Sequence, residues 1–149
     1  MAPEPVSLRT TRYVGAVLLI ASGIVHLQQY FGVYYRVIPV IGPLFVANFV
    51  IALLLGLALL APLDRLGRWV TKLAAVGGVL FAAGSIVALE ISEHGTLFGF
   101  HEHGYRLAVV LSIVFEGLAI VALAGYLASG RPTANSVATR ETQPSPQPS

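Results

Sequence analysis

The side chains able to do chemistry are concentrated in one stretch of this sequence, residues 90–116, which holds four of the seven acidic residues and three of the four histidines. Six imidazole and carboxylate groups lie there between two long apolar segments: Glu90, Glu93, His94, His101, Glu102 and His103. Both kinds of group bind zinc and other borderline divalent ions, so the stretch predicts a divalent metal site as one alternative. The other alternative is a polar loop at a membrane surface without metal, because a bare His-x-His lacks the spacing of known zinc motifs.

A second set of polar side chains lies within the apolar segments, and its central member is a carboxyl group, Glu116. Helical spacing puts Glu116 and Ser112 on one stripe, about 16 Å and 10 Å below the outer end of their segment. Exposing Glu or His to lipid costs roughly a few kcal/mol, so these side chains should face inward. We expect a polar pocket, open to the outer face, that binds a ligand or a proton and is formed by Glu116, His26, Asn48 and Ser112. The alternative is that these groups only hydrogen-bond across the bundle and hold its helices together.

The composition is that of an integral membrane protein. Over 149 residues the chain is 56% hydrophobic and 11% charged, with a mean hydropathy of +0.78, which lies outside the range of soluble domains. There is no cysteine, and the single methionine is Met1, so thiolate and soft copper(I) sites are excluded. The net charge of +2 comes from scattered arginines rather than a basic run, which argues against nucleic acid as a partner. The partners expected are the lipid bilayer and either another membrane protein or a second copy of the chain.

Four apolar segments predict four membrane-spanning helices, at about residues 13–30, 43–61, 69–89 and 105–128. Small residues recur at four-residue steps, with Gly56 in the second segment and Gly78 in the third, where they permit close helix contact. We therefore expect an all-α integral membrane four-helix bundle with short loops.

The ends of the chain are polar. Residues 1–12 are expected to form a cytoplasmic segment, and residues 129–149, rich in Pro, Ser, Thr and Gln, a disordered cytoplasmic tail. The first segment also resembles a signal peptide, since small residues at Ala21 and Gly23 follow an apolar run, and cleavage there is an open alternative.

The distribution of basic residues predicts the orientation. Seven Lys and Arg lie in the two ends of the chain and in the loop between the second and third segments, against two, Arg36 and Arg106, in the other connectors. By the positive-inside rule both termini are cytoplasmic, and the connectors at residues 30–42 and 90–104 face outward.

The chain has four short spans, the sequence GIVHL at the end of the first (residues 23–27) and a polar connector before the fourth. In these features it resembles uncharacterised small bacterial membrane proteins, distantly including the DoxX-like group. The resemblance covers residues 13–128 and implies the fold but no site residue.

No nucleophile elbow, phosphate-binding glycine loop or metalloprotease helix is present. The function expected is that of a small non-enzymatic multi-pass membrane protein, a complex subunit or a minor transporter with an outward pocket. The alternative is a metal-dependent enzyme or redox accessory that uses the His and Glu residues of the outer connector.

Overall fold

The computed structural model describes residues 5–32, 34–62, 68–102 and 104–129, and these contain helices but no strand. Four long helices and one short 3-10 helix follow one another along the chain: α1 (Val6–Gly32), η1 (Tyr34–Val37), α2 (Ile41–Leu60), α3 (Arg68–His94) and α4 (Leu107–Ser129). Each α-helix is long and apolar enough to cross a membrane. The prediction of an all-α chain with four such helices is confirmed for the described residues.

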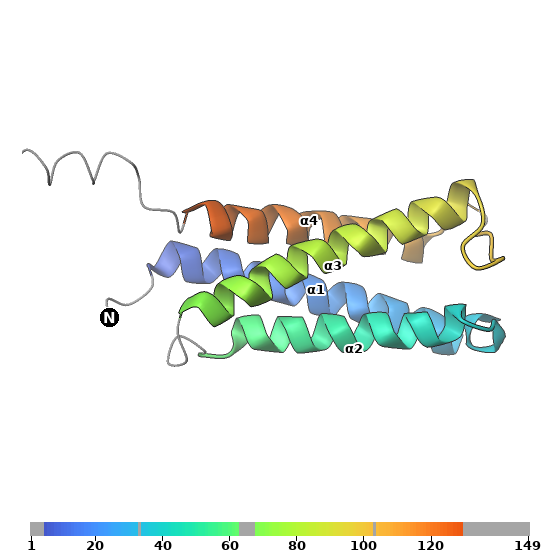
Figure 1. The fold of residues 1–149 in the computed structure, drawn as a ribbon, viewed down its shortest axis with the longest axis horizontal. Helices are drawn as coiled ribbons and strands as arrows, with labels where there is room; N and C mark the ends of the chain where they lie inside the picture. Colours follow the sequence, from blue (N-terminus) through green and yellow to red (C-terminus); the bar gives the residue numbers. More distant parts are fainter. Residues whose placement is uncertain (1–4, 33, 63–67, 103, 130–149) are drawn as a thin grey trace, which may run out of the picture.

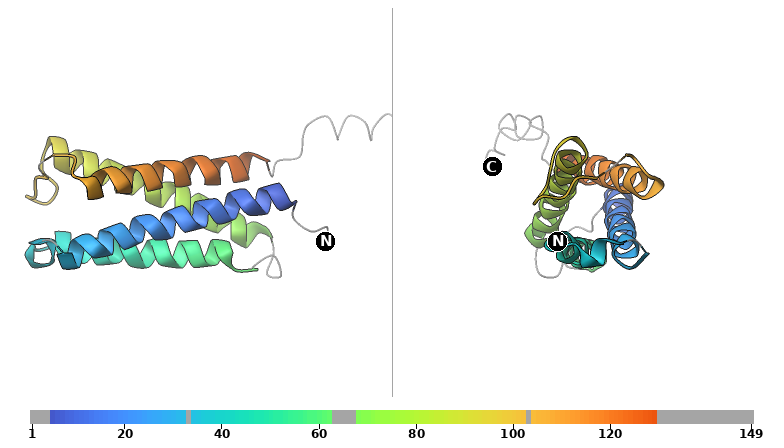
Figure 2. Two further views of the ribbon diagram at one scale, coloured as in Figure 1. Left: turned by 180° about the vertical axis from the view of Figure 1, so that it is seen from behind. Right: turned by 90° about the vertical axis from the view of Figure 1, so that its right-hand side faces the viewer.

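The four α-helices run side by side along one axis (Figure 1) and form a ring in end view (Figure 2). The connections from α1 to α2 and from α3 to α4 lie at one end of the bundle, which we call the connector end. The start of α1 and the end of α4 lie at the opposite end. Around the ring, α2 and α3 pack less closely than the other neighbouring pairs.

Glycine allows the closest helix contacts. A Cβ atom added at Gly56 of α2 would lie 2.5 Å from Ile20 Cγ1 and 3.1 Å from the Ala16 carbonyl oxygen, both on α1. One added at Gly78 of α3 would lie 2.8 Å from a methyl carbon of Leu123 on α4. The sequence-predicted small-residue positions therefore lie at helix contacts, where the absence of a side chain permits close approach.

Two helices extend further than the apolar segments that predict them. Helix α1 begins at Val6, within the segment expected to be a separate polar end, and Thr10 donates a hydrogen bond of 3.0 Å to the Val6 carbonyl oxygen. Helix α3 continues to His94, because no glycine or proline occurs between Leu89 and Gly95. The polar residues 90–94 are thus helical rather than part of a loop. The tail at residues 130–149 lies outside the described residues.

Candidate functional site

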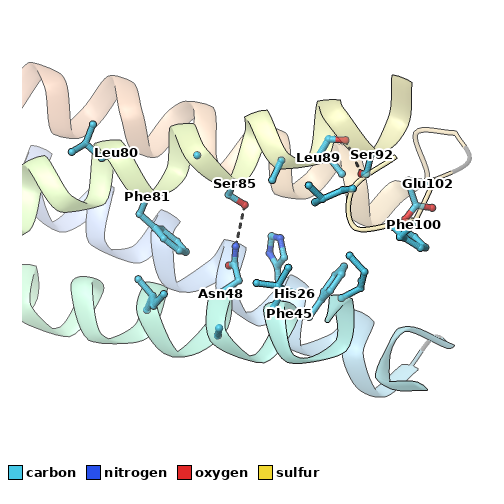
Figure 3. Close-up of a pocket in the computed structure, with 17 residues that line it drawn as sticks. His26, Phe45, Asn48, Leu80, Phe81, Ser85, Leu89, Ser92, Phe100 and Glu102 are labelled. Carbon is cyan, nitrogen blue, oxygen red and sulfur yellow. Dashed lines mark hydrogen bonds between the residues drawn. The ribbon is translucent and has the colours of Figure 1, made fainter. Parts of the chain in front are cut away.

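A cavity of about 390 Å³ lies between α2 and α3, in the half of the bundle nearest the connector end (Figure 3). This is within the range of about 300–1,000 Å³ that is usual for small-molecule sites. Most of the lining is apolar and comes from α2 and α3, and it includes Ile41, Leu44, Phe45, Ile51, Leu80 and Phe81. The polar lining groups are few: His26, Asn48, Ser85, Ser92 and Glu102.

His26 reaches this cavity from α1, beside the ring of Phe45 on α2, with 5.4 Å between ring centroids. Its Nδ1 lies 3.0 Å from the Ser22 carbonyl oxygen, one helical turn back. A carbonyl oxygen can only accept, so Nδ1 carries a proton in that contact. In neutral His26, Nε2 is then a hydrogen-bond acceptor.

Asn48 connects the two helices that enclose the cavity. Its amide Nδ2 on α2 donates a hydrogen bond of 3.0 Å to Ser85 Oγ on α3. Asn48 Oδ1 is buried and has no hydrogen-bond partner among the described residues. Asn48 therefore links α2 and α3, the neighbouring pair of helices that packs least closely.

Glu116 lies inside the bundle, with 1% of its surface exposed, but it does not line the cavity. Its Oε1 accepts a hydrogen bond of 2.8 Å from Ser22 Oγ on α1. Its Oε2 has no hydrogen-bond partner among the described residues, although Ser85 lies beside the carboxyl group. The residue bonded to Glu116 is thus Ser22, rather than the expected His26, Asn48 or Ser112. Ser22 stands one turn before His26 on the same polar stripe, and that spacing is the signal that could have identified it.

The four residues expected to form one pocket, Glu116, His26, Asn48 and Ser112, lie at three different sites in the bundle. His26 and Asn48 line the large cavity, and Glu116 lies with Ser22 in the interior. Ser112 borders a smaller void of about 30 Å³, which it shares with His26, Gln29, Tyr35 and Glu102. His26 and Glu102 border both spaces. A binding role for these residues stays a prediction, and the geometry assigns His26 and Asn48 to the cavity itself.

The connector end of the cavity carries a charged cluster that sequence reasoning did not assemble, formed by Tyr35, Glu102 and Arg106. Tyr35 and Glu102 are buried, with 5% and 7% exposure. The Tyr35 hydroxyl donates to Glu102 Oε2, and Arg106 Nη2 donates to the Tyr35 hydroxyl oxygen and, over 2.6 Å, to Glu102 Oε1. The Tyr35 ring is stacked on Phe45 of α2, with 4.7 Å between centroids. We call residues 95–106, between α3 and α4, the α3–α4 connector. The Tyr35–Glu102–Arg106 cluster attaches this connector to η1 and α2.

The backbone of the connector supports the same arrangement. Phe98 and Gly99 have positive φ values of 53° and 79°, and Leu97 and Phe100 exchange two backbone hydrogen bonds around them. This is the geometry of a tight hairpin turn. The Glu102 N–H then donates a hydrogen bond of 2.8 Å to the Ser92 carbonyl oxygen on α3. Leu97, Phe100 and Glu102 are thereby held against the end of the cavity, which all three line.

Burial raises the pKa of the Tyr35 hydroxyl above its ordinary value, and the hydrogen bond to Glu102 and the Glu102 charge raise it further. Since the folded state favours the protonated hydroxyl, the contribution of Tyr35 to stability is fully present below the unfolded pKa of about 10. It is lost only as the pH rises above that value. Tyr35 therefore keeps its hydroxyl proton throughout the neutral range.

Replacing Glu102 with Ala is expected to loosen the connector. The change removes the acceptor for two donors, one of them charged, and hydrogen bonds of this kind contribute about 1.5–3 kcal/mol each. We expect amide exchange in residues 95–106 to become at least about tenfold faster, which corresponds to about 1.4 kcal/mol. Hydrogen-exchange mass spectrometry in nanodiscs measures this. Glu90→Ala is the matched control, because Glu90 bonds Tyr105 and pairs with His94 at an exposed site. Equal exchange in the two variants would show that the cluster does not hold the connector.

The six residues considered as metal ligands have other contacts where the structure describes them. Glu90 accepts from Tyr105, Glu93 accepts a 3.1 Å hydrogen bond from the Gly104 N–H, and His101 Nδ1 contacts the Gly95 carbonyl oxygen. His94 pairs with Glu90, and Glu102 belongs to the cluster described above. Among the described residues no three His, Asp or Glu side chains come together as a metal-ligand set. His103 lies outside the described residues, and a divalent metal site stays a prediction.

Comparison of the chain with family models, with curated proteins and with solved structures finds no match in any of the three. The resemblance to DoxX-like proteins therefore stays a prediction.

The Ser22–Glu116 contact predicts an unusual order of stabilities. Ser22→Ala removes the hydroxyl group that donates to the buried Glu116 carboxyl group, and this is expected to destabilise the protein by about 1–3 kcal/mol. Glu116→Leu removes the carboxyl group altogether and should cost less, since an apolar residue can replace a buried polar one with little loss. The double variant should melt close to Glu116→Leu. Unfolding in detergent, analysed as a double-mutant cycle, measures the coupling. Additive effects of the two changes would contradict a direct interaction.

Proposed function

We propose that this protein is a non-enzymatic multi-pass membrane protein that binds a small lipophilic molecule in the cavity between α2 and α3, as a complex subunit or a minor transporter. The observation that carries the proposal is the cavity itself. It has the volume of a ligand site, and three helices and the α3–α4 connector contribute to its lining.

The chemistry of the lining favours an apolar ligand. Leucine, isoleucine and phenylalanine side chains make up most of the wall, and hydrogen-bonding groups occur at only a few positions. Transfer of apolar surface from water into such a site is favourable by about 25 cal/mol per Å². A small polar molecule would lose hydration there and find few partners. We therefore propose a largely apolar site with polar groups at selected points, in place of the polar pocket expected from the sequence.

Photolabelling with benzophenone tests the proposal. Purified protein in lipid nanodiscs is irradiated at increasing benzophenone concentrations, and the labelled residues are mapped by mass spectrometry. We expect labelling at cavity residues such as Phe81 to saturate, while labelling at Val121, an exposed residue of α4 outside the cavity, rises linearly. Linear labelling at both positions would count against a binding site.

We further propose that the bundle spans the cell membrane with its connector end outside and both termini in the cytoplasm. The length and apolar character of the four helices support insertion, and the seven-to-two distribution of Lys and Arg supports the orientation.

The orientation predicts the labelling of single cysteines in intact cells. Because the chain has no cysteine, Thr96→Cys in the connector and Ser136→Cys in the tail each introduce one thiol. An impermeant maleimide should label the first and not the second until the cells are opened. Ser136 lies outside the described residues, but its side of the membrane follows from the orientation. Labelling at Ser136→Cys with protection at Thr96→Cys would reverse the assignment.

A further inference from the structure

The cavity is elongated along the helices. Its lining on α3 runs from Leu80 to Ser92, about 18 Å at 1.5 Å per residue. Its lining on α2 runs from Ile41 to Ile51, about 15 Å by the same rise. A volume of about 390 Å³ over this length gives a narrow slot parallel to the helices, and Figure 3 shows its lining side chains spread along α2 and α3. The hydrocarbon chains of a bilayer run in the same direction as this slot and have a similarly narrow cross-section.

The slot is covered at the connector end. Leu97 and Phe100 of the connector lie across it, and the Phe100 ring meets the Tyr35 ring edge-on, with 5.7 Å between centroids. Glu102 is fixed beside them by its bonds to Tyr35 and Arg106. Entry from water at this end would require the cluster and the tight turn to open.

The side of the slot is open instead. Leu44 and Ile51 of α2 and Leu80 of α3 all line the cavity, yet they are 43%, 43% and 68% exposed. These side chains lie on apolar helices that would face hydrocarbon in a membrane. The opening falls between the two helices that pack least closely. A molecule dissolved in the bilayer can therefore enter sideways, without passing through water.

The ends of the slot differ in polarity. Ser92, Glu102 and His26 lie toward the connector end, whereas Ile51, Leu80 and Phe81 form the opposite end. The Glu102 carboxylate and neutral His26 Nε2 are acceptors, so they match a head group that donates a hydrogen bond. The carboxylate also disfavours an anionic head group, and Arg106, its partner, is not part of the lining.

We propose that the ligand is a single-chain amphiphile with an uncharged, hydroxyl-bearing head group, which enters from the bilayer between α2 and α3. Its head lies at the connector end beside Glu102 and its chain extends toward Phe81. This inference rests on the proposed function and specifies the ligand class and the entry route of the same site.

The test uses dodecanol with a diazirine at the chain end, incorporated into nanodiscs that contain the protein. We expect saturable cross-links at the end of the slot opposite the connector, at residues such as Phe81 and Ile51. Unlabelled dodecanol should compete at least tenfold better than butanol, which lacks the long chain, and better than dodecanoate, which has an anionic head. Equal competition by butanol or by dodecanoate would overturn the ligand class. If benzophenone labels the cavity saturably and the dodecanol probe does not, the proposed function stands and this inference fails.

A separate variant tests the entry route. Leu80→Trp places a large side chain at the lateral opening and should slow cross-linking by at least tenfold, because Leu80 is both exposed and part of the lining. Val121→Trp, at a 70% exposed position on α4 outside the lining, is the matched control and should leave the rate unchanged. An unchanged rate in Leu80→Trp would contradict lateral entry.

Discussion

Gly56→Leu is expected to prevent normal folding, with a loss of stability of about 3 kcal/mol or more, at the upper end of the range for overpacking. Even the first added carbon would lie 2.5 Å from Ile20 Cγ1 and 3.1 Å from the Ala16 carbonyl oxygen. The backbone oxygen cannot move aside as a side chain can, so α1 and α2 must separate. Accumulation in membranes and the melting temperature in detergent measure the effect.

The same chain provides a control for this experiment. Gly117 lies on α4, where an added Cβ would meet nothing within 4 Å, so Gly117→Leu introduces the same side chain without a clash. We expect Gly117→Leu to accumulate and melt like the parent protein. If Gly56→Leu does the same, the α1–α2 contact is wrong, and with it the position of His26 relative to α2.

Much of the fold follows from local pattern. Four apolar segments of membrane-spanning length predict four helices, and small residues such as Gly56 and Gly78 indicate which faces lie in contact. The cost of exposing a carboxyl group to lipid predicts that Glu116 turns inward, where the structure places it. These predictions succeed because each depends only on the sequence of one helix and on the medium that surrounds it.

The arrangement of the site does not follow in the same way. Glu102 and Tyr35 are 67 positions apart, and nothing in either local sequence indicates that they meet. Helical stripes indicate that Glu116 and His26 both face inward, but the rotation and offset of neighbouring helices decide which groups bond. Glu116 therefore bonds Ser22, while His26 lines the cavity. The cavity is likewise a property of the loose α2–α3 contact, which has no signature in either helix.

Gly84→Leu is expected to abolish saturable ligand binding without harming the fold. Gly84 lines the cavity on α3, and an added Cβ there would meet nothing within 4 Å, so we expect a leucine side chain to occupy this part of the cavity without a clash. Glycine is also about 0.8–1 kcal/mol less favourable than alanine within a helix, and leucine ranks just below alanine, so the substitution favours the helix. The variant should thus melt at or above the temperature of the parent protein while its cavity is filled.

The most direct test of the cavity as a binding site is therefore benzophenone photolabelling of Gly84→Leu beside Gly117→Leu in the same nanodiscs. Both variants carry the same added side chain at an uncrowded glycine, and only Gly84 lines the cavity. We predict that saturable labelling at Phe81 falls at least tenfold in Gly84→Leu and is unchanged in Gly117→Leu. Equal saturable labelling in the two folded variants would contradict binding between α2 and α3.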